Sequence, residues 1–107
     1  MRLLNLTLLP VLAAGMLYGQ VHKGLENGET IFRQRCGGCH GLDGKAQTTI
    51  GKNQAMRDLG SPEVQKQTDT ELTQTIANGR GRMPAYEMIL GNERIKAVVV
   101  YIRQMGH

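Results

Sequence analysis

The stretch CGGCH, residues 36–40, carries the most reactive side chains of this sequence. Two glycines separate Cys36 from Cys39, and His40 follows directly. The chain of 107 residues has no other cysteine. Two thiols and an imidazole at this spacing could form a disulfide, a zinc site, a thiol redox centre or the attachment site of a haem group.

Three of these four interpretations leave part of the pattern unexplained. A zinc site needs about four ligands, usually as two pairs, and this chain offers one cysteine pair. A thioredoxin-like centre needs a βαβ pattern around C-x-x-C, and the sequence shows no strand with a partner. A disulfide is common in exported proteins, but this one would close a tiny loop and stabilise little. It would also leave His40 without a role.

The fourth interpretation uses every residue of the stretch. C-x-x-C-H is the spacing for covalent attachment of c-type haem. The two thiols add to the two vinyl groups on one edge of the porphyrin, and the next residue is carried under the iron. We therefore predict one covalently attached haem c, with Cys36 and Cys39 as the attachment points and His40 as an axial iron ligand.

The second axial ligand is predicted to be Met83. This residue lies in a glycine-rich loop just after a predicted helix end, and Pro84 stiffens the chain that follows. A thioether favours ferrous iron, so a His/Met pair raises the reduction potential. With both axial positions occupied, the iron would exchange one electron and would not bind oxygen or substrate.

Other residues could also supply this ligand. Met56, in a long loop, stays an alternative, as does a second histidine near one of the chain ends, His22 or His107. We expect the two remaining methionines after the N-terminal segment, Met88 and Met105, to lie in the core.

The N-terminal segment indicates export. Residues 3–17, LLNLTLLPVLAAGML, are almost entirely apolar and follow Arg2. This length fits the core of a secretory signal, about 7–15 residues, better than a membrane span of roughly 20. We predict that residues 1–19 are a cleaved signal peptide and that residues 20–107 form one periplasmic domain. The alternative is an uncleaved N-terminal anchor, which would associate the protein with a membrane.

The composition indicates a small domain with too few large apolar side chains to form a stable core by itself. The sequence has one Phe, three Tyr, no Trp and 14 Gly. A domain this short usually needs a disulfide, a metal or a cofactor as a staple. The net charge of +4 comes from scattered basic residues, which argues against a nucleic-acid-binding face.

The elements that must position these residues are predicted to be helices. Residues 28–35 form a short helix with Asn27 as its N-cap, and Gly37-Gly38 should break it. Residues 68–78 form a second helix, because Thr68 and Glu71 have capping-box spacing and Gly79 is placed to end it.

The last predicted helix spans residues 93–104, with Asn92 as its N-cap. An apolar stripe of 3.6-residue period supports it: Ile95, Val98, Val99, Ile102 and Met105. Residues 41–60 have no clean period and are expected to form a long loop, which four apolar residues would pin to the surface: Leu42, Ile50, Met56 and Leu59. The fold class is therefore all-α, with three to four short helices and long loops around one haem.

Three stretches resemble the class I c-type cytochromes of the small, single-haem, bacterial kind: GETIFRQRCGGCHG, IANGRGRMPAY and IKAVVVYIRQM. The resemblance covers nearly all of residues 20–107. It implies thioethers at Cys36 and Cys39, His40 as the proximal ligand and Met83 as the distal ligand.

The resemblance also implies details of packing. Gly28 and Phe32 on the first helix should meet Tyr101 of the last helix. The family tends to have a proline shortly after C-x-x-C-H, whose carbonyl accepts the imidazole N–H. Here the next proline is Pro62, so another loop carbonyl is expected in that role. Four basic residues are candidates for pairing with the haem propionates: Lys52, Arg57, Arg80 and Arg82.

The predicted function is one-electron transport. The protein would cycle between Fe(III) and Fe(II) and dock transiently to larger redox proteins, a donor and an acceptor, as a monomer and not as an enzyme. The alternative is a haem-bearing subunit of a dehydrogenase or oxidase complex. A third class, a ligand-binding or peroxidatic haem protein, would require an open sixth position on the iron.

Overall fold

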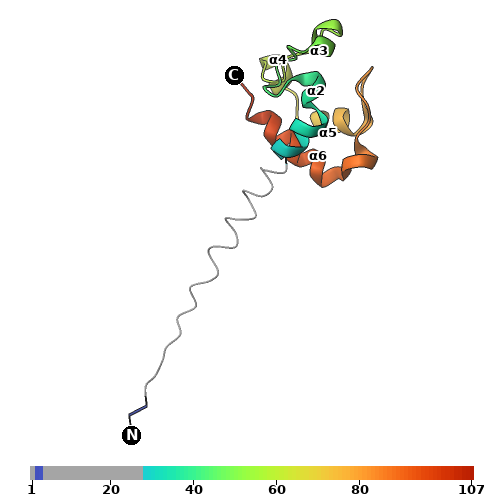
Figure 1. Ribbon diagram of the computed structural model, residues 1–107. Helices are drawn as coiled ribbons and strands as arrows, with labels where there is room; N and C mark the ends of the chain where they lie inside the picture. The colour runs from blue at the N-terminus through green and yellow to red at the C-terminus, as the bar shows by residue number, and fades with distance from the viewer. Residues whose placement is uncertain (1, 4–27) are drawn as a thin grey trace.

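The computed structural model describes residues 2–3 and 28–107, and these are organised as helices and loops (Figure 1). Residues 28–35 are helical. The helices that follow are α2 (Gly37–His40), α3 (Thr49–Asn53), α4 (Pro62–Gln65), α5 (Asp69–Asn78) and α6 (Glu87–Arg103). Extended pairing in this part of the chain is limited to one isolated bridge, Arg80 with Met83. The predicted all-α fold is confirmed, but this part of the chain contains six helices and not the three to four predicted.

Three predictions fall outside the described residues. They are the cap at Asn27, the candidate ligand His22 and nearly all of the signal segment 1–19. Within the described part of the chain, no helix has the length and apolar character needed to cross a bilayer.

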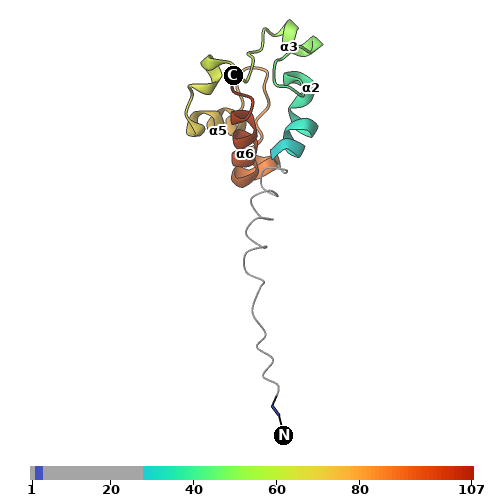
Figure 2. The same cartoon turned by 90° about the vertical axis from the view of Figure 1, so that its left-hand side faces the viewer.

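The core lies where α6 packs against α5 and against the helix of residues 28–35. Figure 2 shows α6 between these two elements. Eight buried side chains form one cluster: Phe32, Val64, Leu72, Ile76, Ile95, Val98, Val99 and Ile102. The predicted stripe of the last helix is confirmed, with Met105 partly buried against the cluster.

The first helix and α6 cross at very close range. A Cβ built at Gly28 would lie 2.2 Å from the carbonyl oxygen of Ala97, so only glycine fits there. One turn later, Phe32 packs against Tyr101 with ring centroids 5.4 Å apart and an interplanar angle of 57°. The predicted contact between Gly28, Phe32 and Tyr101 is therefore present, and it fixes the helix that leads to Cys36.

The predicted start and stop signals of α5 are confirmed. The Thr68 hydroxyl accepts from the Glu71 N–H at 3.1 Å, and the Glu71 carboxylate accepts from the Thr68 N–H at 2.8 Å. The helix ends at Gly79, whose φ of 75° is left-handed and favours glycine.

The last helix begins earlier than predicted. α6 starts at Glu87 and has a kink at Gly91, with φ 73° and ψ 164°. The predicted helix of residues 93–104 corresponds to the part of α6 after this kink, but the non-helical residue before it is Gly91 and not the predicted cap Asn92. Met88, in the first turn of α6, is 96% exposed. The prediction that it lies in the core is therefore wrong.

The region around the two glycines also differs from the prediction. Gly37 and Gly38 do not break the helix. They belong to α2, while the interruption lies at Cys36. α2 ends at His40, and its C-cap is Gly41, with φ 78°. The Cys36 N–H still donates to the Phe32 carbonyl at 2.8 Å, so the chain direction continues through the interruption.

The long loop contains a helix that the sequence pattern did not indicate. α3 begins after Thr48, whose hydroxyl accepts from the Gly51 N–H and donates to the Cys39 carbonyl at 2.6 Å. This second bond fastens the loop to α2. Of the expected apolar pins, Met56 and Leu59 are partly buried, while Leu42 and Ile50 are exposed.

Candidate haem-binding site

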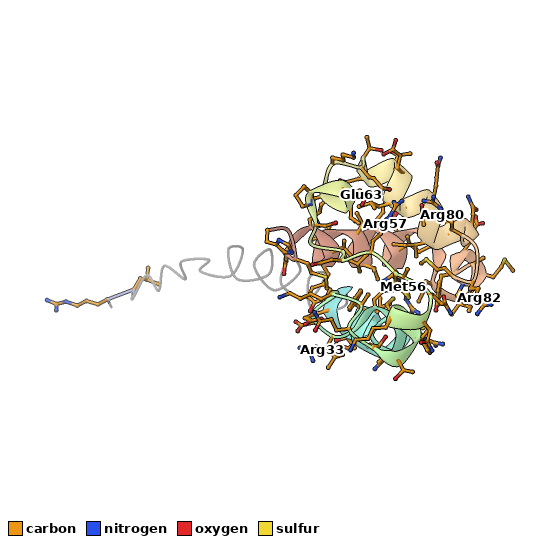
Figure 3. The ribbon with its side chains drawn as sticks, turned by 90° about the horizontal axis from the view of Figure 1, so that it is seen from above. Arg33, Met56, Arg57, Glu63, Arg80 and Arg82 are labelled. Carbon is orange, nitrogen blue, oxygen red and sulfur yellow. The ribbon has the colours of Figure 1, made fainter. Side chains whose placement is uncertain are left out.

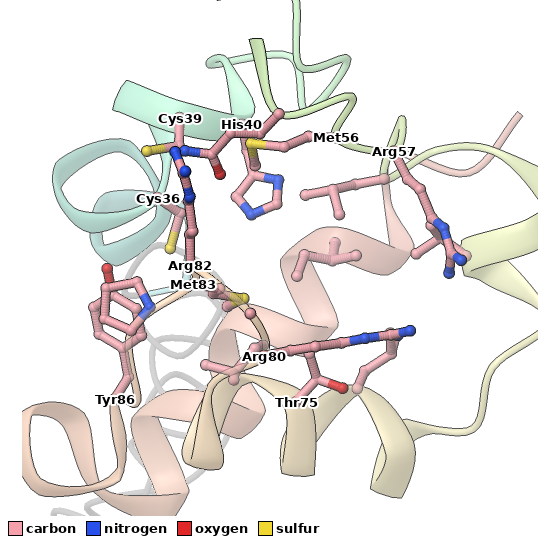
Figure 4. Close-up of a pocket in the computed structure, with 18 of the residues that line it drawn as sticks. Cys36, Cys39, His40, Met56, Arg57, Thr75, Arg80, Arg82, Met83 and Tyr86 are labelled. Atoms are coloured by element: carbon pink, nitrogen blue, oxygen red, sulfur yellow. The ribbon is translucent and has the colours of Figure 1, made fainter. Parts of the chain in front are cut away.

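A cavity of about 730 Å³ lies between α2, the loop after α3, α5 and α6. Its walls include Cys36, Cys39, His40 and Met83, so the structure brings all four predicted site residues together (Figure 4). Core side chains such as Leu72, Ile76 and Val98 line it as well. Pockets for cofactors commonly measure about 300–1,000 Å³ and are mostly apolar, which this cavity matches.

Helical geometry groups the three residues of the C-x-x-C-H motif. The His40 N–H donates to the Cys36 carbonyl at 2.9 Å, and the Cys39 N–H donates to the same carbonyl at 3.2 Å. Residues three and four apart lie on one face of a helical turn, so both thiols and the imidazole face the same side. The sequence spacing alone predicts this grouping once the turn is helical.

Met83 reaches the cavity from a loop that is fastened at both ends. The Met83 N–H donates to the Arg80 carbonyl at 2.9 Å, and the Arg80 N–H donates to the Met83 carbonyl at 3.2 Å. Downstream, the Tyr86 N–H donates to the Ile76 carbonyl at 3.0 Å. In Figure 4 His40 extends into the cavity from α2, and Met83 lies across the cavity from it.

The competing ligand candidates occupy different positions. Met56 lines the same cavity, so it stays the alternative sulfur ligand. Met88 and Met105 are not among the lining residues. His107 is also not among them, and its imidazole lies 3.1 Å from the Asp58 carboxylate.

Burial lowers the pKa of His40 below its ordinary value of 6.5. The imidazole is therefore neutral at neutral pH, which is the form that can donate a lone pair to a metal. Its Nδ1 is buried and has no hydrogen-bond partner among the described residues. The loop carbonyl expected to accept from this imidazole is thus not found there, and the ring is oriented by packing, with Phe32 at a centroid distance of 6.4 Å.

The state of the cysteines argues against a thiol redox centre. Both thiols are free. Desolvation, followed by the charge on Cys39, raises the pKa of the Cys36 thiol to about 11. Redox-active cysteines instead have lowered pKa values. Nor do the described residues contain a cluster of three or more His, Cys, Asp or Glu side chains that could bind zinc.

Four arginines line the cavity. Three of them, Arg57, Arg80 and Arg82, are predicted partners of the haem propionates, and the fourth predicted cation, Lys52, does not line it. The fourth arginine is Arg35, which the sequence reasoning missed. Its position directly before Cys36 could have indicated it.

The residues present therefore fit a haem group. The cavity is large and apolar, two free thiols and a neutral imidazole share one of its faces, and a thioether lies across from them. A buried imidazole nitrogen without a partner also indicates that the site is built around a group beyond the protein side chains.

Comparison with known proteins identifies the family. Residues 23–102 match the family described as "Cytochrome C oxidase, cbb3-type, subunit III". The chain belongs to this family. It is a c-type cytochrome domain, and its cofactor is covalently bound haem c.

Several relatives of this cytochrome domain are known. It is 37% identical over 83 residues to the cbb3-type cytochrome c oxidase subunit FixP of Bradyrhizobium diazoefficiens, covering 74% of this chain and 27% of FixP. It is 31% identical over 88 residues to subunit CcoP of Azospirillum brasilense, covering 76% and 28% respectively. The chain thus spans little more than a quarter of these oxidase subunits.

Two smaller proteins match over more of their own length. Cytochrome c6 of Rippkaea orientalis is 33% identical over 75 residues, covering 70% of this chain and 65% of cytochrome c6. The solved structure of the c-type cytochrome KustC0563 has a TM-score of 0.69 and 29% identity, covering 75% of this chain and 98% of its own. The chain thus matches nearly all of KustC0563 and about two thirds of this cytochrome c6.

Proposed function

We propose that this cytochrome domain is a one-electron carrier of an exported redox system. Cys36 and Cys39 would hold the haem through thioether bonds, with His40 and Met83 as axial ligands. The observation that carries this proposal is that all four side chains line one cavity. When bound, haem supplies an iron that changes oxidation state by one electron.

The protein's own residues have separate roles in this proposal. The neutral His40 imidazole and the Met83 thioether would hold the iron and would leave no position for oxygen or substrates. A neutral soft thioether favours the ferrous state and raises the potential. The apolar walls from Leu72, Ile76 and Val98 keep water away from the group. With no open coordination position, the protein would act as a carrier and not as an enzyme.

The oxidase relatives support a second candidate, a haem-bearing subunit of a larger complex. The small cytochromes support the free carrier, because this chain covers 98% of KustC0563. We place the domain in the periplasm, with residues 1–19 as a cleaved signal. An intact-mass measurement of the exported protein would test the cleavage.

A visible spectrum of the purified protein, oxidised and reduced, tests the proposal. We expect the bands of a six-coordinate c-type haem, and we expect the pigment to stay with the polypeptide through acid–organic extraction and denaturing electrophoresis. A colourless protein from cells able to attach haem c, or pigment released by extraction, would overturn it. Sedimentation of the exported protein distinguishes the two candidates, because a free carrier sediments as a monomer. Such a monomer should also be reduced and reoxidised by itself.

A further inference from the structure

The charges around the cavity are of one sign. Among the described residues that line it, four are arginines and none is Asp or Glu. The arginines are Arg35, Arg57, Arg80 and Arg82, and all four are exposed. A cavity lined by one sign of charge attracts groups of the opposite sign.

The attachment chemistry divides these arginines into two pairs. Haem carries its vinyl groups along one edge and its two propionate carboxylates on the opposite side of the ring. Attachment at Cys36 and Cys39 therefore places the propionates at the end of the cavity away from the cysteines. In Figure 4 the side chains of Arg57 and Arg80 extend toward that end. Figure 3 shows both arginines on the same side of the molecule.

The other two arginines lie at the cysteine end. Arg82 is on the side of Cys36 and Cys39 in Figure 4. Arg35 precedes Cys36 directly, and its carbonyl accepts from the Tyr86 hydroxyl at 3.2 Å, which joins this segment to the loop that carries Arg82. Propionates at the opposite end would lie away from this segment.

Neither Arg35 nor Arg82 has a carboxylate partner among the described residues. The ion pairs of that part of the chain involve other cations: Arg33, Arg57, Lys96, Arg103 and His107. By contrast, Arg57 is paired with Glu63 at 3.4 Å. Arg35 and Arg82 are therefore two exposed positive charges, beside the attachment edge, that no described carboxylate neutralises.

We propose that Arg35 and Arg82 form a docking site for an acidic patch on a redox partner protein, whereas Arg57 and Arg80 neutralise the haem propionates. The proposal rests on the proposed function, because it requires haem attached at Cys36 and Cys39. It assigns the partner a chemistry, a cluster of surface carboxylates, and places contact at the edge of the cavity where the cysteines lie. The two cations would steer and orient the partner more than they would tighten the complex.

Small redox reagents of opposite charge test this division. The reduced holoprotein gives one electron to hexacyanoferrate(III), which becomes hexacyanoferrate(II), and no proton or covalent bond is transferred. A cationic oxidant, tris(phenanthroline)cobalt(III), takes one electron in the same way. Second-order rates are measured at low and at high salt, since the Debye length falls from about 30 Å at 0.01 M to about 3 Å at 1 M.

The variants are Arg35→Gln and Arg82→Gln, with Arg94→Gln as the matched control. Arg94 is exposed and does not line the cavity, so its substitution removes the same net charge elsewhere. We expect each of the first two substitutions to lower the rate of electron transfer to hexacyanoferrate(III) at least about twofold at low salt and to raise the rate with the cobalt reagent. Both effects should be lost at high salt. Their reduction potentials should equal that of Arg94→Gln, whereas Arg57→Gln and Arg80→Gln should shift the potential.

A carboxylate surface provides the second measurement. On a poly-L-glutamate resin, Arg35→Gln and Arg82→Gln should elute at lower salt than Arg94→Gln, although all three have the same net charge. If they elute together and react alike with both oxidants, the docking proposal is wrong while the carrier function stands. Absence of covalently bound pigment in the unmodified protein would instead overturn both.

Discussion

Met83 is the residue whose role decides the chemistry of the site. Its thioether is held at the cavity by the two backbone bonds with Arg80. In Met83→Ala we expect a folded protein in which the reduced form binds carbon monoxide. Its reduction potential should fall by on the order of 100 mV, within the roughly 0.8 V range that axial ligands command. A carbon monoxide difference spectrum and a redox titration measure the two effects.

Two other methionines supply the controls for that experiment. Met88→Ala removes a side chain that is 96% exposed and should leave spectrum and potential unchanged. Met56→Ala tests the alternative ligand, because Met56 lines the same cavity. If Met56→Ala produces carbon monoxide binding and Met83→Ala does not, the assignment of Met83 is wrong.

The sequence predicts the donor atoms of the site better than their surroundings. Thiols and imidazole at C-x-x-C-H spacing face one side because a helical turn requires it. The hydrogen bonding of His40 Nδ1 could not be predicted, and this nitrogen has no partner among the described residues. Whether a backbone acceptor lies beside it depends on the path of the loop, which carries no side-chain signature. Arg35 differs, because its position directly before Cys36 could have indicated its place on the cavity wall.

At the scale of elements, the crossing of the first helix over α6 sets the position of the motif. Gly28→Ala places a Cβ 2.2 Å from the Ala97 carbonyl oxygen, so the helices must separate. We expect the free energy of unfolding to fall by about 1–3 kcal/mol. Guanidinium denaturation of the holoprotein measures it.

Gly38→Ala is the matched control for this substitution. Gly38 lies in α2, and a Cβ there meets nothing within 4 Å. Alanine favours a helix more than glycine does, so this variant should be as stable as the unmodified protein or slightly more so. Equal losses in both variants would show that the close approach to Ala97 is not the cause.

The capping box stabilises the start of α5, the helix that supplies Leu72 and Ile76 to the cavity wall. Thr68→Ala removes the hydroxyl that accepts from the Glu71 N–H. We expect a loss of about 1 kcal/mol in the free energy of unfolding, measured by denaturation. Thr70→Ala, at an exposed position in the first turn of the same helix, should have a much smaller effect, and similar losses would argue against a capping role.

Periodicity and capping residues predict the elements that have them. α5 and the second part of α6 match their predicted spans because a regular apolar stripe and a cap specify them locally. The prediction fails where tertiary contacts determine the conformation. α2 contains two glycines that favour a break, yet backbone bonds to Phe32 and Cys36 and the Thr48 bond to Cys39 hold it helical.

At the scale of the whole molecule, the cavity occupies the place where a domain of this size would have its core. The buried cluster contains a single aromatic side chain, Phe32. Six of its eight members also line the cavity wall: Phe32, Val64, Leu72, Ile76, Val98 and Ile102. We therefore expect Cys36→Ala combined with Cys39→Ala to yield little folded protein when no haem is attached. Far-UV circular dichroism and limited proteolysis measure this. A variant with native helix content and protease resistance would show that the polypeptide forms its core without the cofactor.

The C-terminal segment closes the molecule onto the loop that precedes α4, near the cavity. The His107 N–H donates to the Gly60 carbonyl at 3.0 Å, and the Asp58 carboxylate accepts from the Gly60 N–H at 2.8 Å. The pKa of Asp58 is lowered below its ordinary value of 3.8. The largest cause is the bond from the Gly60 N–H, and the next is the bond with the His107 ring. A carboxyl whose pKa is lower in the folded state stabilises the fold when it is ionised.

This stabilisation should depend on pH in a definite direction. It is fully present well above pH 3.8 and is lost as the pH falls through the lowered pKa of folded Asp58. We therefore expect Asp58→Asn to be less stable than the unmodified protein near pH 7, and the two unfolding free energies to converge as the solution is made more acidic than about pH 4. Glu87→Gln, which removes an exposed carboxylate without a hydrogen-bonded partner among the described residues, should leave the acid dependence unchanged. Parallel curves for Asp58→Asn and the unmodified protein over the whole range would mean that this carboxylate does not couple the C-terminal segment to the loop.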